Sequence, residues 1–376
     1  LKTDYRIYTD EWDEGNATLI LANNERNGYL QSIKERINWD VKRLENIVSH
    51  WENKQKSYAA DDIISAFQKS ANEQTLLNFM NGIIARLKQM GKHRTSETYY
   101  ATLRSFMQFR ESKDILLDEI DSDLMLMYEA WLHGKRITKN SSSFYMRILR
   151  AVYNKAVKQG LAVQTFPFRE VYTGVARTSK RAVDEETIRK LQRLDLSGSP
   201  ALALSRDMFV FSYCARGMAF VDMAYLKKED VGGGRITYYR HKTGQYLTLR
   251  IEPCMVTILE RYGRTCPESP YLFPILTDEQ PELAYRQYRT GLNYHNRKLK
   301  RLGKLLGEPL PLSSYTPRHS WATAARNHDV PIAVISAGMG HSSERTTLIY
   351  LDSLDNAIID NANEKILKGL NDTISM

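Results

Sequence analysis

The residues between 315 and 350 include three side chains that could act together on one phosphate group. Arg318 offers a planar fork of N–H donors that matches two phosphate oxygens. His341 could donate to a third oxygen, or move a proton near neutral pH. Tyr350 carries a hydroxyl that becomes a nucleophile once a base or a nearby positive charge helps it to ionise. We therefore expect nucleophilic chemistry on a phosphate in this stretch.

The order and spacing of these residues make the pattern specific. The chain has 22 tyrosines, and many tyrosines are packing residues, so Tyr350 alone would indicate little. Here it follows Arg-His-Ser-Trp-Ala-Thr at 318–323 and Gly-His-Ser-Ser at 340–343, and it stands nine residues after His341. This order resembles the second active-site box of the tyrosine recombinases, the phage integrase family. The resemblance extends over about 180–355, roughly half of the chain.

The resemblance implies a role for each of five residues. Arg216 and Arg318 would be the two catalytic arginines, and Lys242, on a hairpin turn, would be the general acid for the leaving 5′ oxygen. His341 would donate to a phosphate oxygen, and Tyr350 would form a 3′-phosphotyrosyl link. Two guanidinium groups and an imidazole can neutralise the charge that builds on five-coordinate phosphorus. The implied reaction is DNA strand cleavage and rejoining without a metal or a cofactor.

Two positions depart from the family pattern. The family has an acidic residue three positions after the first arginine, whereas Asp222 stands six positions after Arg216. We expect Asp222 to orient that arginine, and a purely structural ion pair between the two is the alternative. The family also has a histidine three residues before the second arginine, where this chain has Tyr315. Tyr315 would either hydrogen-bond the phosphate or only pack.

For Lys242, the alternative to the general-acid role is an ordinary exposed lysine on a hairpin.

Composition favours a polyanionic partner and argues against several other classes. The chain has 376 residues, a net charge of +9 and a pI near 9.2. Its three cysteines lack metal-type spacing, which predicts neither a zinc site nor a disulfide framework and fits a reducing, cytoplasmic compartment. No apolar run approaches ~18 residues, so we expect no membrane span, and we find no signal peptide pattern.

Periodicity predicts a multidomain, mainly α-helical protein with a small antiparallel β hairpin or sheet. The resemblance identifies its two main parts as a helical core DNA-binding domain and a tyrosine recombinase catalytic domain. The expected segments are the remnant of an N-terminal, arm-type domain at 1–28, a connector helix at 29–60, the core-binding domain at 61–163, a linker at 164–182, the catalytic domain at 183–355 and a tail helix at 356–376.

Local signals place several element boundaries. Asn72 is expected to cap a helix that runs through Leu76. Asp121 or Ser122 is expected to open a second helix, and Asp184 a third. Residues 200–214 and 282–305 read as helices, the second of them long and basic. Residues 235–240 and 246–251 alternate like two strands around a hairpin tip at 241–244, which carries Lys242.

Basic side chains lie between and along the helices expected before residue 182. Phosphate contacts by such residues position a protein on DNA without reading its sequence, and a merely solvated basic face is the alternative. The residues expected to bind DNA are Lys92, Arg94, Arg147, Arg150, Lys180 and Arg181.

The resemblance implies a site-specific DNA recombinase, most like the integrases of phages and conjugative transposons. Its partners would be double-stranded DNA, further copies of the chain in a tetramer on that DNA, and accessory DNA-bending proteins. Two other functions stay open. A type IB topoisomerase shares the chemistry but relaxes supercoils without exchanging partners, and a DNA-binding regulator could retain the fold without catalysis.

Overall fold

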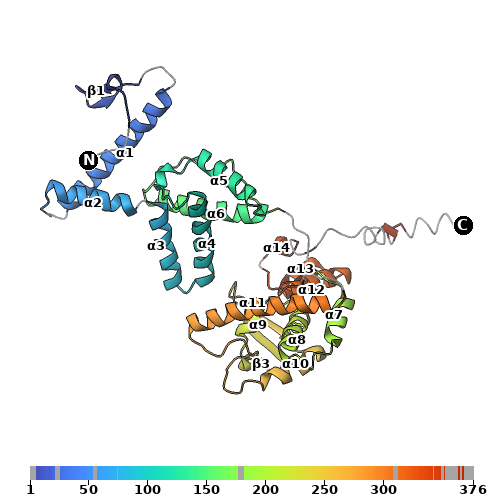
Figure 1. The fold of residues 1–376 in the computed structure, drawn as a ribbon. Coiled ribbons are helices and arrows are strands. Elements are labelled where there is room, and N and C mark those ends of the chain that lie inside the picture. Colours follow the sequence, from blue (N-terminus) through green and yellow to red (C-terminus); the bar gives the residue numbers. More distant parts are fainter. Residues whose placement is uncertain are drawn as a thin grey trace. The chain divides into compact units, whose positions relative to one another are not determined.

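The computed structural model describes residues 6–21, 26–53, 57–73, 75–176, 182–307, 312–341, 343–348, 351, 363–364 and 366–367. The chain divides into two compact units, unit 1 (Leu1–Ala176) and unit 2 (Arg177–Met376). Both are mainly helical, and the described strands form two small antiparallel sheets, which confirms the predicted fold class (Figure 1). No helix of the described residues is both long and apolar enough to cross a lipid bilayer.

In the described part of unit 1, a short hairpin is followed by six α-helices. Strand β1 (Trp12–Asp13) pairs antiparallel with β2 (Thr18–Leu19). The helices are α1 (Asn27–Asn53), α2 (Ala60–Glu73), α3 (Leu76–Gln89), α4 (His93–Phe109), α5 (Ser122–Gly134) and α6 (Lys139–Lys158).

The side chain at the start of a helix satisfies backbone N–H groups that have no partner within the helix. Asp121 and Asp184 do this for two helices, each accepting a backbone N–H three residues on at 2.8 Å, as predicted. The prediction of Asn72 as the cap of α3 is wrong, because Asn72 lies within α2. Thr75 caps α3 instead, and it accepts a backbone N–H at 3.4 Å.

The core of unit 1 lies among α3, α4, α5 and α6, each of which buries one face. Phe106 and Tyr128 meet edge to face with ring centroids 5.1 Å apart. The buried Tyr128 hydroxyl donates to the Ser105 hydroxyl at 2.8 Å, so its polar end has a partner. Helices α4 and α6, which carry Arg94, Arg147 and Arg150, are thus packed into one core.

Residues 161–176 follow α6 and pack against the helices of unit 1, whereas the sequence predicts a linker that begins at residue 164. Phe168 is buried in the core of unit 1. The Ser143 hydroxyl donates to the Gly174 carbonyl at 2.5 Å, and the Asn140 amide exchanges two hydrogen bonds with the Ala176 backbone, at 2.9 and 2.7 Å. The described chain is therefore part of unit 1 as far as Ala176.

Unit 2 combines helices with one three-stranded sheet. Its helices are α7 (Glu185–Arg193), α8 (Pro200–Cys214), α9 (Phe220–Tyr225), α10 (Pro253–Gly263), α11 (Pro281–Leu305), α12 (Thr316–Asn327), α13 (Ile332–Gly338) and α14 (Glu344–Leu348). Its strands are β3 (Val231–Gly232), β4 (Arg235–Tyr239) and β5 (Tyr246–Arg250).

Helix α8 lies at the centre of unit 2 and contacts α7, α9, α10, α11 and α12. Residues 208–211 are all buried, so no side of the helix faces solvent there. A helix that is apolar on every side is stable only when it is enclosed by other elements. Figure 1 shows these helices gathered around α8. The end of α8 is therefore a fixed point in the unit.

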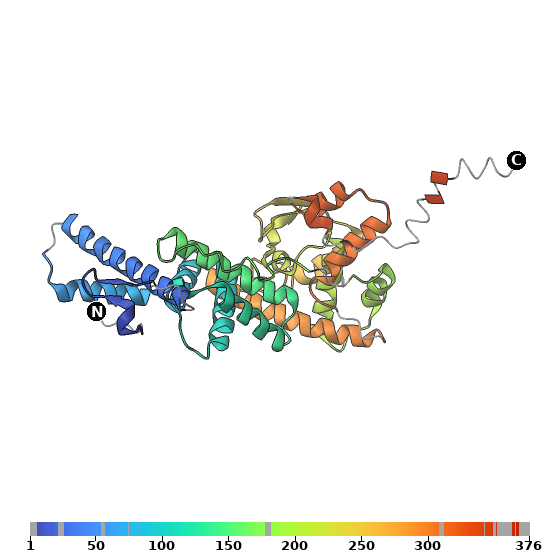
Figure 2. The same ribbon diagram turned by 90° about the horizontal axis from the view of Figure 1, so that it is seen from above.

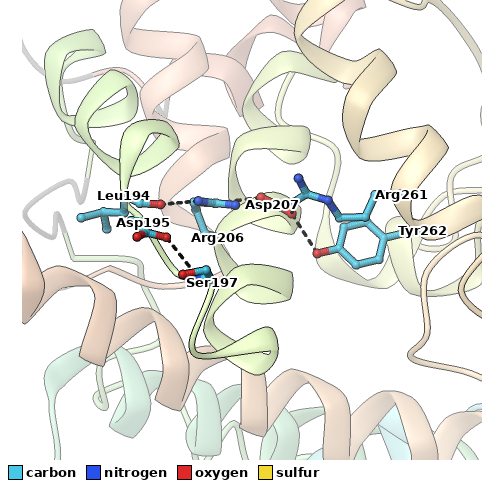
Figure 3. Close-up of polar contacts among 7 residues, drawn as sticks. All are labelled: Leu194, Asp195, Ser197, Arg206, Asp207, Arg261 and Tyr262. Carbon is cyan, nitrogen blue, oxygen red and sulfur yellow. Dashed lines mark hydrogen bonds and ion pairs between the residues drawn. The ribbon is translucent and has the colours of Figure 1, made fainter.

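A buried carboxylate connects α8 to the loop before it and to α10 (Figure 3). Asp207 accepts from the Arg206 Nε at 2.8 Å, from the Tyr262 hydroxyl at 2.8 Å and from the Arg261 guanidinium. Arg206 also donates to the Leu194 carbonyl at 2.5 Å. A carboxylate out of water needs such donors, because an unpaired buried charge is costly. We name Asp207 and its three donors, Arg206, Arg261 and Tyr262, the Asp207 cluster.

The sheet of unit 2 has the order β3-β4-β5 and is antiparallel throughout. Ile236 stands opposite Leu249, and Tyr238 opposite Leu247. Along β4 every second side chain is buried, and this alternation continues to Arg240, one residue beyond the strand. Figure 2 shows these strands, in yellow, beside the red segment that carries α13 and α14.

Candidate functional site

Arg318 occupies the first turn of α12 and is 3% exposed. Its Nη1 donates to the Gly217 carbonyl at 2.7 Å, and its Nη2 donates to the Met339 carbonyl at 2.6 Å. Nη2 also lies 3.0 Å from His341 Nε2. The guanidinium thus connects the end of α8, the end of α13 and the histidine, three segments that are distant in sequence.

Arg216 lies in the turn that ends α8, and the turn has an unusual backbone. Arg216 and Gly217 both adopt the left-handed region, with φ of 58° and 72°. A Cβ on Gly217 would stand 2.7 Å from the Arg318 Cα, so only glycine allows this approach. The Arg216 Cδ lies 3.8 Å from the position that a Cβ on Gly338 would take. The turn therefore brings Arg216 to the end of α13, near Arg318.

Lys242 is exposed in the hairpin between β4 and β5. Arg240, two residues before Lys242, closes the loop through its backbone. Its N–H donates to the Gln245 carbonyl, and its carbonyl accepts from the Gly244 N–H, both at 2.8 Å. The buried Asp222 carboxylate accepts the His241 N–H at 2.8 Å. The hairpin is thus fixed to α9 by the residue that directly precedes Lys242.

Asp222 does not form the ion pair with Arg216 that the sequence offered as an alternative. Both residues are described, and they make no such pair within 4.0 Å. The carboxylate acts on the hairpin instead. Burial raises the pKa of Asp222, and the backbone N–H of His241 and the charges of Arg240, His241 and Arg318 oppose that rise.

His341 is buried directly after α13, and its ring is held at both nitrogens. Nδ1 lies 2.9 Å from the Thr347 hydroxyl, on α14. Burial, together with the charges of Arg318, Arg240 and Lys242, lowers the pKa of His341 to about 4. A neutral ring has one N–H, and an arginine can only donate. Nε2 therefore accepts from Arg318, and Nδ1 donates to Thr347.

The charges of these segments act on the buried Tyr238 hydroxyl of β4. Burial raises the pKa of its hydroxyl, and so does the charge of Asp222. The charges of Arg318, Arg240 and Arg216 oppose that rise. The positive charge of Lys242 acts on His341 as well. Positive charge is therefore concentrated around these residues of unit 2. Such a site attracts an anion with several oxygens. Among the described residues, no group of His, Cys, Asp and Glu could hold a metal ion.

The other two expected residues are Tyr350 and Tyr315. Tyr350 lies outside the described residues, which reach Leu348 and resume at Leu351. Tyr315 is described. It precedes α12, is 40% exposed, and has its ring centroid 5.7 Å from that of His319. The structure therefore brings together Arg216, Lys242, Arg318 and His341, from α8, the hairpin, α12 and the turn after α13.

The expected DNA-binding residues of unit 1 are exposed. They are Lys92, Arg94, Arg147 and Arg150. Arg94 pairs with Glu97 at 3.1 Å, and Arg150 donates to the Thr173 hydroxyl at 3.2 Å. Lys180 and Arg181 lie outside the described residues.

Sequence reasoning missed Arg240 and Thr347. Arg240 is 6% exposed, and its guanidinium donates to the Gly340 carbonyl. The signal was present: alternation along β4 buries Ile236 and Tyr238, and it puts Arg240 on the same face. No comparable signal marks Thr347, which is buried only because α14 turns back onto His341.

Two family models match the chain. Residues 75–171 match the phage integrase SAM-like domain, and residues 186–357 match the phage integrase family. Together the two matches extend over more than half of the chain, one in each unit.

Curated relatives and solved structures agree with these matches. Tyrosine recombinase XerD of Pseudomonas aeruginosa is 23% identical over 265 residues, which covers 68% of this chain and 85% of the relative. Tyrosine recombinase XerA of Pyrococcus furiosus is 26% identical over 230 residues, covering 60% and 74%.

Among solved structures, a lambda integrase dimer bound to a COC′ core site has a TM-score of 0.56 at 15% identity, covering 94% of this chain and 97% of that one. The Tn1549 transposon integrase in complex with a circular intermediate DNA has a TM-score of 0.56 at 14% identity, covering 78% and 99%. The fold is thus that of the integrases in both units. With the family models and the curated relatives, this establishes that the chain belongs to the tyrosine recombinase (phage integrase) family.

Proposed function

We propose that this chain is a site-specific recombinase that cleaves and rejoins DNA strands through a 3′-phosphotyrosyl intermediate on Tyr350. One observation carries the proposal: Arg318 contacts the turn of Arg216, the end of α13 and His341 at once. That arrangement concentrates donors and positive charge where one phosphate could bind. The segment that follows, α14, already contacts His341 through Thr347 and leads directly to Tyr350.

The chemistry follows from the charge of the reacting group. The Tyr350 oxygen attacks the phosphorus, and the bond from phosphorus to the 5′ oxygen breaks. Arg216 and Arg318 stabilise the negative charge on the equatorial oxygens as the five-coordinate state forms. Lys242 gives a proton to the departing 5′ oxygen. The phosphotyrosyl link is itself a phosphodiester, so the 5′ hydroxyl of a second strand can attack it and release Tyr350.

His341 changes its role when a phosphate arrives. Without DNA it is neutral and accepts from Arg318. A bound phosphodiester is negatively charged, and a nearby negative charge raises the pKa of an imidazole. At the same time Arg318 turns its donors toward the phosphate. His341 is then able to take up a proton and to donate to a phosphate oxygen, with Thr347 still orienting its Nδ1. The proton that Tyr350 loses can pass to His341, and Tyr315, which precedes α12, can hydrogen-bond the phosphate.

Double-stranded DNA is the proposed partner, and a tetramer on DNA is the proposed working assembly. The similar lambda integrase has been solved as a dimer on a core site and as a tetramer bound to a Holliday junction. The net charge of +9 supports binding to a polyanion. In this proposal the exposed basic side chains of unit 1 contact phosphates, together with Lys180 and Arg181. The proposal also includes accessory DNA-bending proteins as partners and a cytoplasmic location.

The proposed boundaries of the functional parts are those expected from the sequence. The core-binding domain is proposed at 61–163 and the catalytic domain at 183–355, and the matches at 75–171 and 186–357 support these two parts. Residues 1–28 and 29–60 are proposed as an arm-type remnant and a connector helix. Residues 356–376 are proposed as a tail helix, and their structure lies mostly outside the described residues.

The test uses a suicide DNA substrate with a nick beside the cleavage site, so that the cut strand diffuses away and the covalent adduct accumulates. The wild-type chain should form an adduct that resists denaturation, and Tyr350→Phe should form none. Tyr294→Phe, which also removes one exposed hydroxyl of unit 2, is the matched control and should behave as the wild type. An adduct formed by Tyr350→Phe would refute the assignment of the nucleophile.

The same assay separates the other two functions, which the relatives named above do not favour. Exchange of strands between two duplexes is expected of a recombinase, whereas relaxation of supercoils without exchange would indicate a topoisomerase. A wild-type chain that binds the DNA and forms no adduct would indicate a regulator.

A further inference from the structure

Arg240 is a buried cation that the proposed reaction does not use. It is 6% exposed and stands one residue beyond β4, on the face of the strand that points into unit 2. Removing a guanidinium from water costs several kcal/mol unless strong partners replace the water. Its guanidinium donates to the carbonyl of Gly340, the residue directly before His341. The side chain of Arg240 therefore holds the turn that delivers the histidine.

The backbone of the same residue shapes the loop that carries Lys242. The Arg240 N–H donates to the Gln245 carbonyl at 2.8 Å, and the Arg240 carbonyl accepts from Thr243 and Gly244, at 3.2 and 2.8 Å. These bonds enclose residues 241–244. Lys242 itself is exposed, and nothing on its own side chain restricts it among the described contacts. Its position therefore depends on how firmly Arg240 is held.

Arg240 connects two segments of the site: its backbone bonds within the hairpin, and its guanidinium bonds the turn before His341. Asp222 is the buried carboxylate whose charge interacts with Arg240, and it also accepts the His241 N–H at 2.8 Å. A Cβ on Gly340 would lie 2.8 Å from a methyl group of Leu247 on β5, so the turn packs closely on the hairpin, and the Gly340 φ of 64° favours glycine. The hairpin and the segment of His341 thus meet in a tight contact with the Arg240 guanidinium between them.

We propose that Arg240 is a positioning residue that fixes Lys242 and His341 relative to each other. The inference rests on the roles proposed above for those two residues. Arg240 does not need to touch DNA for this purpose, because its Nη1 already donates to the Gly340 carbonyl. Removing the guanidinium frees the turn at Gly340 from the hairpin. The general acid and the histidine then no longer share one fixed geometry.

The test compares two variants with a matched control on two substrates. Arg240→Ala removes the guanidinium, and Arg240→Lys keeps a positive charge but cannot reproduce the planar donor geometry. Arg250→Ala removes an exposed arginine at the end of the same hairpin, where it pairs with Glu252 at 3.0 Å. The first substrate is the nicked suicide DNA. The second carries sulfur in place of the leaving 5′ oxygen, and a thiolate leaves without needing a proton because its pKa is about 8.5.

We expect both Arg240 variants to bind the DNA normally and to cleave the oxygen substrate roughly 10- to 100-fold more slowly, because a reacting group misplaced by about 1 Å can slow a reaction about 100-fold. On the sulfur substrate the loss should shrink by about tenfold or more, because the misplaced general acid is no longer needed. Arg250→Ala should match the wild type on both substrates. If Arg240→Ala unfolds, the same comparison is made with Arg240→Lys.

Two outcomes would overturn the inference. One is cleavage by the Arg240 variants at the wild-type rate. The other is an equal loss on both substrates, accompanied by a lower melting temperature, which would make Arg240 a residue of stability alone. Lys242→Ala, measured in parallel, distinguishes this failure from that of the proposed function. If sulfur does not rescue Lys242→Ala, the general-acid role itself is wrong. If it does, and the Arg240 variants behave differently, only the positioning role fails.

Discussion

Replacing Gly217 with alanine should displace Arg318 while every charged group of the site stays in the chain. Gly217 has φ 72°, where a residue with a Cβ pays a conformational cost of roughly 1–2 kcal/mol. The new Cβ would also stand 2.7 Å from the Arg318 Cα and 2.9 Å from its Cγ, whereas ordinary contacts begin at 3.4 Å. The two segments must therefore separate by about 0.7 Å.

That separation acts on catalysis more than on folding. Arg318 donates to the carbonyl of Gly217 itself, so the arginine moves together with the hydrogen bond that orients it. A misplacement of about 1 Å can cost a reaction about 100-fold, so we expect suicide-substrate cleavage to fall by roughly 10- to 100-fold. The free energy of unfolding should fall by about 2 kcal/mol, from backbone strain and the local shift. DNA affinity should change little, because the DNA-binding residues of unit 1 are untouched.

Gly234→Ala is the matched control for this experiment. Gly234 has φ 70°, almost the same as Gly217, and no atom lies within 4 Å of its Cβ position. It should therefore lose about the same 1–2 kcal/mol of backbone stability and keep its cleavage rate. Single-turnover cleavage, a binding titration and thermal unfolding are measured on both variants. Equal cleavage rates for the two would refute the argument that the missing Cβ of Gly217 positions Arg318.

Three further predictions concern stability. Asp207→Asn leaves Arg206 and Arg261 without their charge partner and should lower the free energy of unfolding in urea by about 2–4 kcal/mol. The loss should be smaller than for a fully buried pair, because Arg261 is half-exposed. Glu186→Gln, in an exposed pair, should cost under about 1 kcal/mol, and similar losses for both would contradict the argument. Burial lowers the pKa of His295 from 6.5 to about 3, so the folded state holds it neutral and the unfolded chain binds the proton more readily. Stability should therefore decrease as pH falls below about 6.5, by up to about 1.4 kcal/mol per pH unit from this group, and a His295→Phe variant should show a shallower decrease between pH 6.5 and 4. Phe166 has φ 54° while 66% exposed, so Phe166→Asn should raise the unfolding free energy by about 0.5–1 kcal/mol, and an unchanged or lower melting temperature would count against backbone strain there.

Much of the fold follows from local rules. The apolar run at 200–214 and the basic periodic segment at 282–305 form α8 and α11 almost to the residue, because helix period and burial pattern agree there. Asp121 and Asp184 cap helices because a short carboxylate suits the first turn. The start of α3 also carries a local cap, Thr75, and a contact from a distant segment adds to it. Its Leu76 N–H donates to the Ile115 carbonyl at 2.8 Å, a contact made by a segment far along the chain.

The boundary of unit 1 shows a limit of such local rules. Residues 164–176 have no periodicity, and from sequence they read as a linker. They are held by Asn140 and Ser143 of α6 through side-chain hydrogen bonds, and Phe168 fills a place in a core formed by other helices. An irregular segment can be fixed as firmly as a helix when its backbone groups find partners, and those partners are not visible in the segment itself.

By itself the sequence determined which groups are available for chemistry: an arginine, a lysine, a second arginine and a histidine in a family-specific order, followed by a tyrosine. Only the tertiary structure decided their condition. His341 is buried and neutral in the fold. Asp222 accepts from the hairpin backbone and does not pair with Arg216. Arg240 connects the hairpin of Lys242 to the turn before His341. The physical reason is distance along the chain. Residue type and order are local properties, whereas burial and hydrogen-bond partners come from segments about a hundred residues away, as with Arg240 and Gly340.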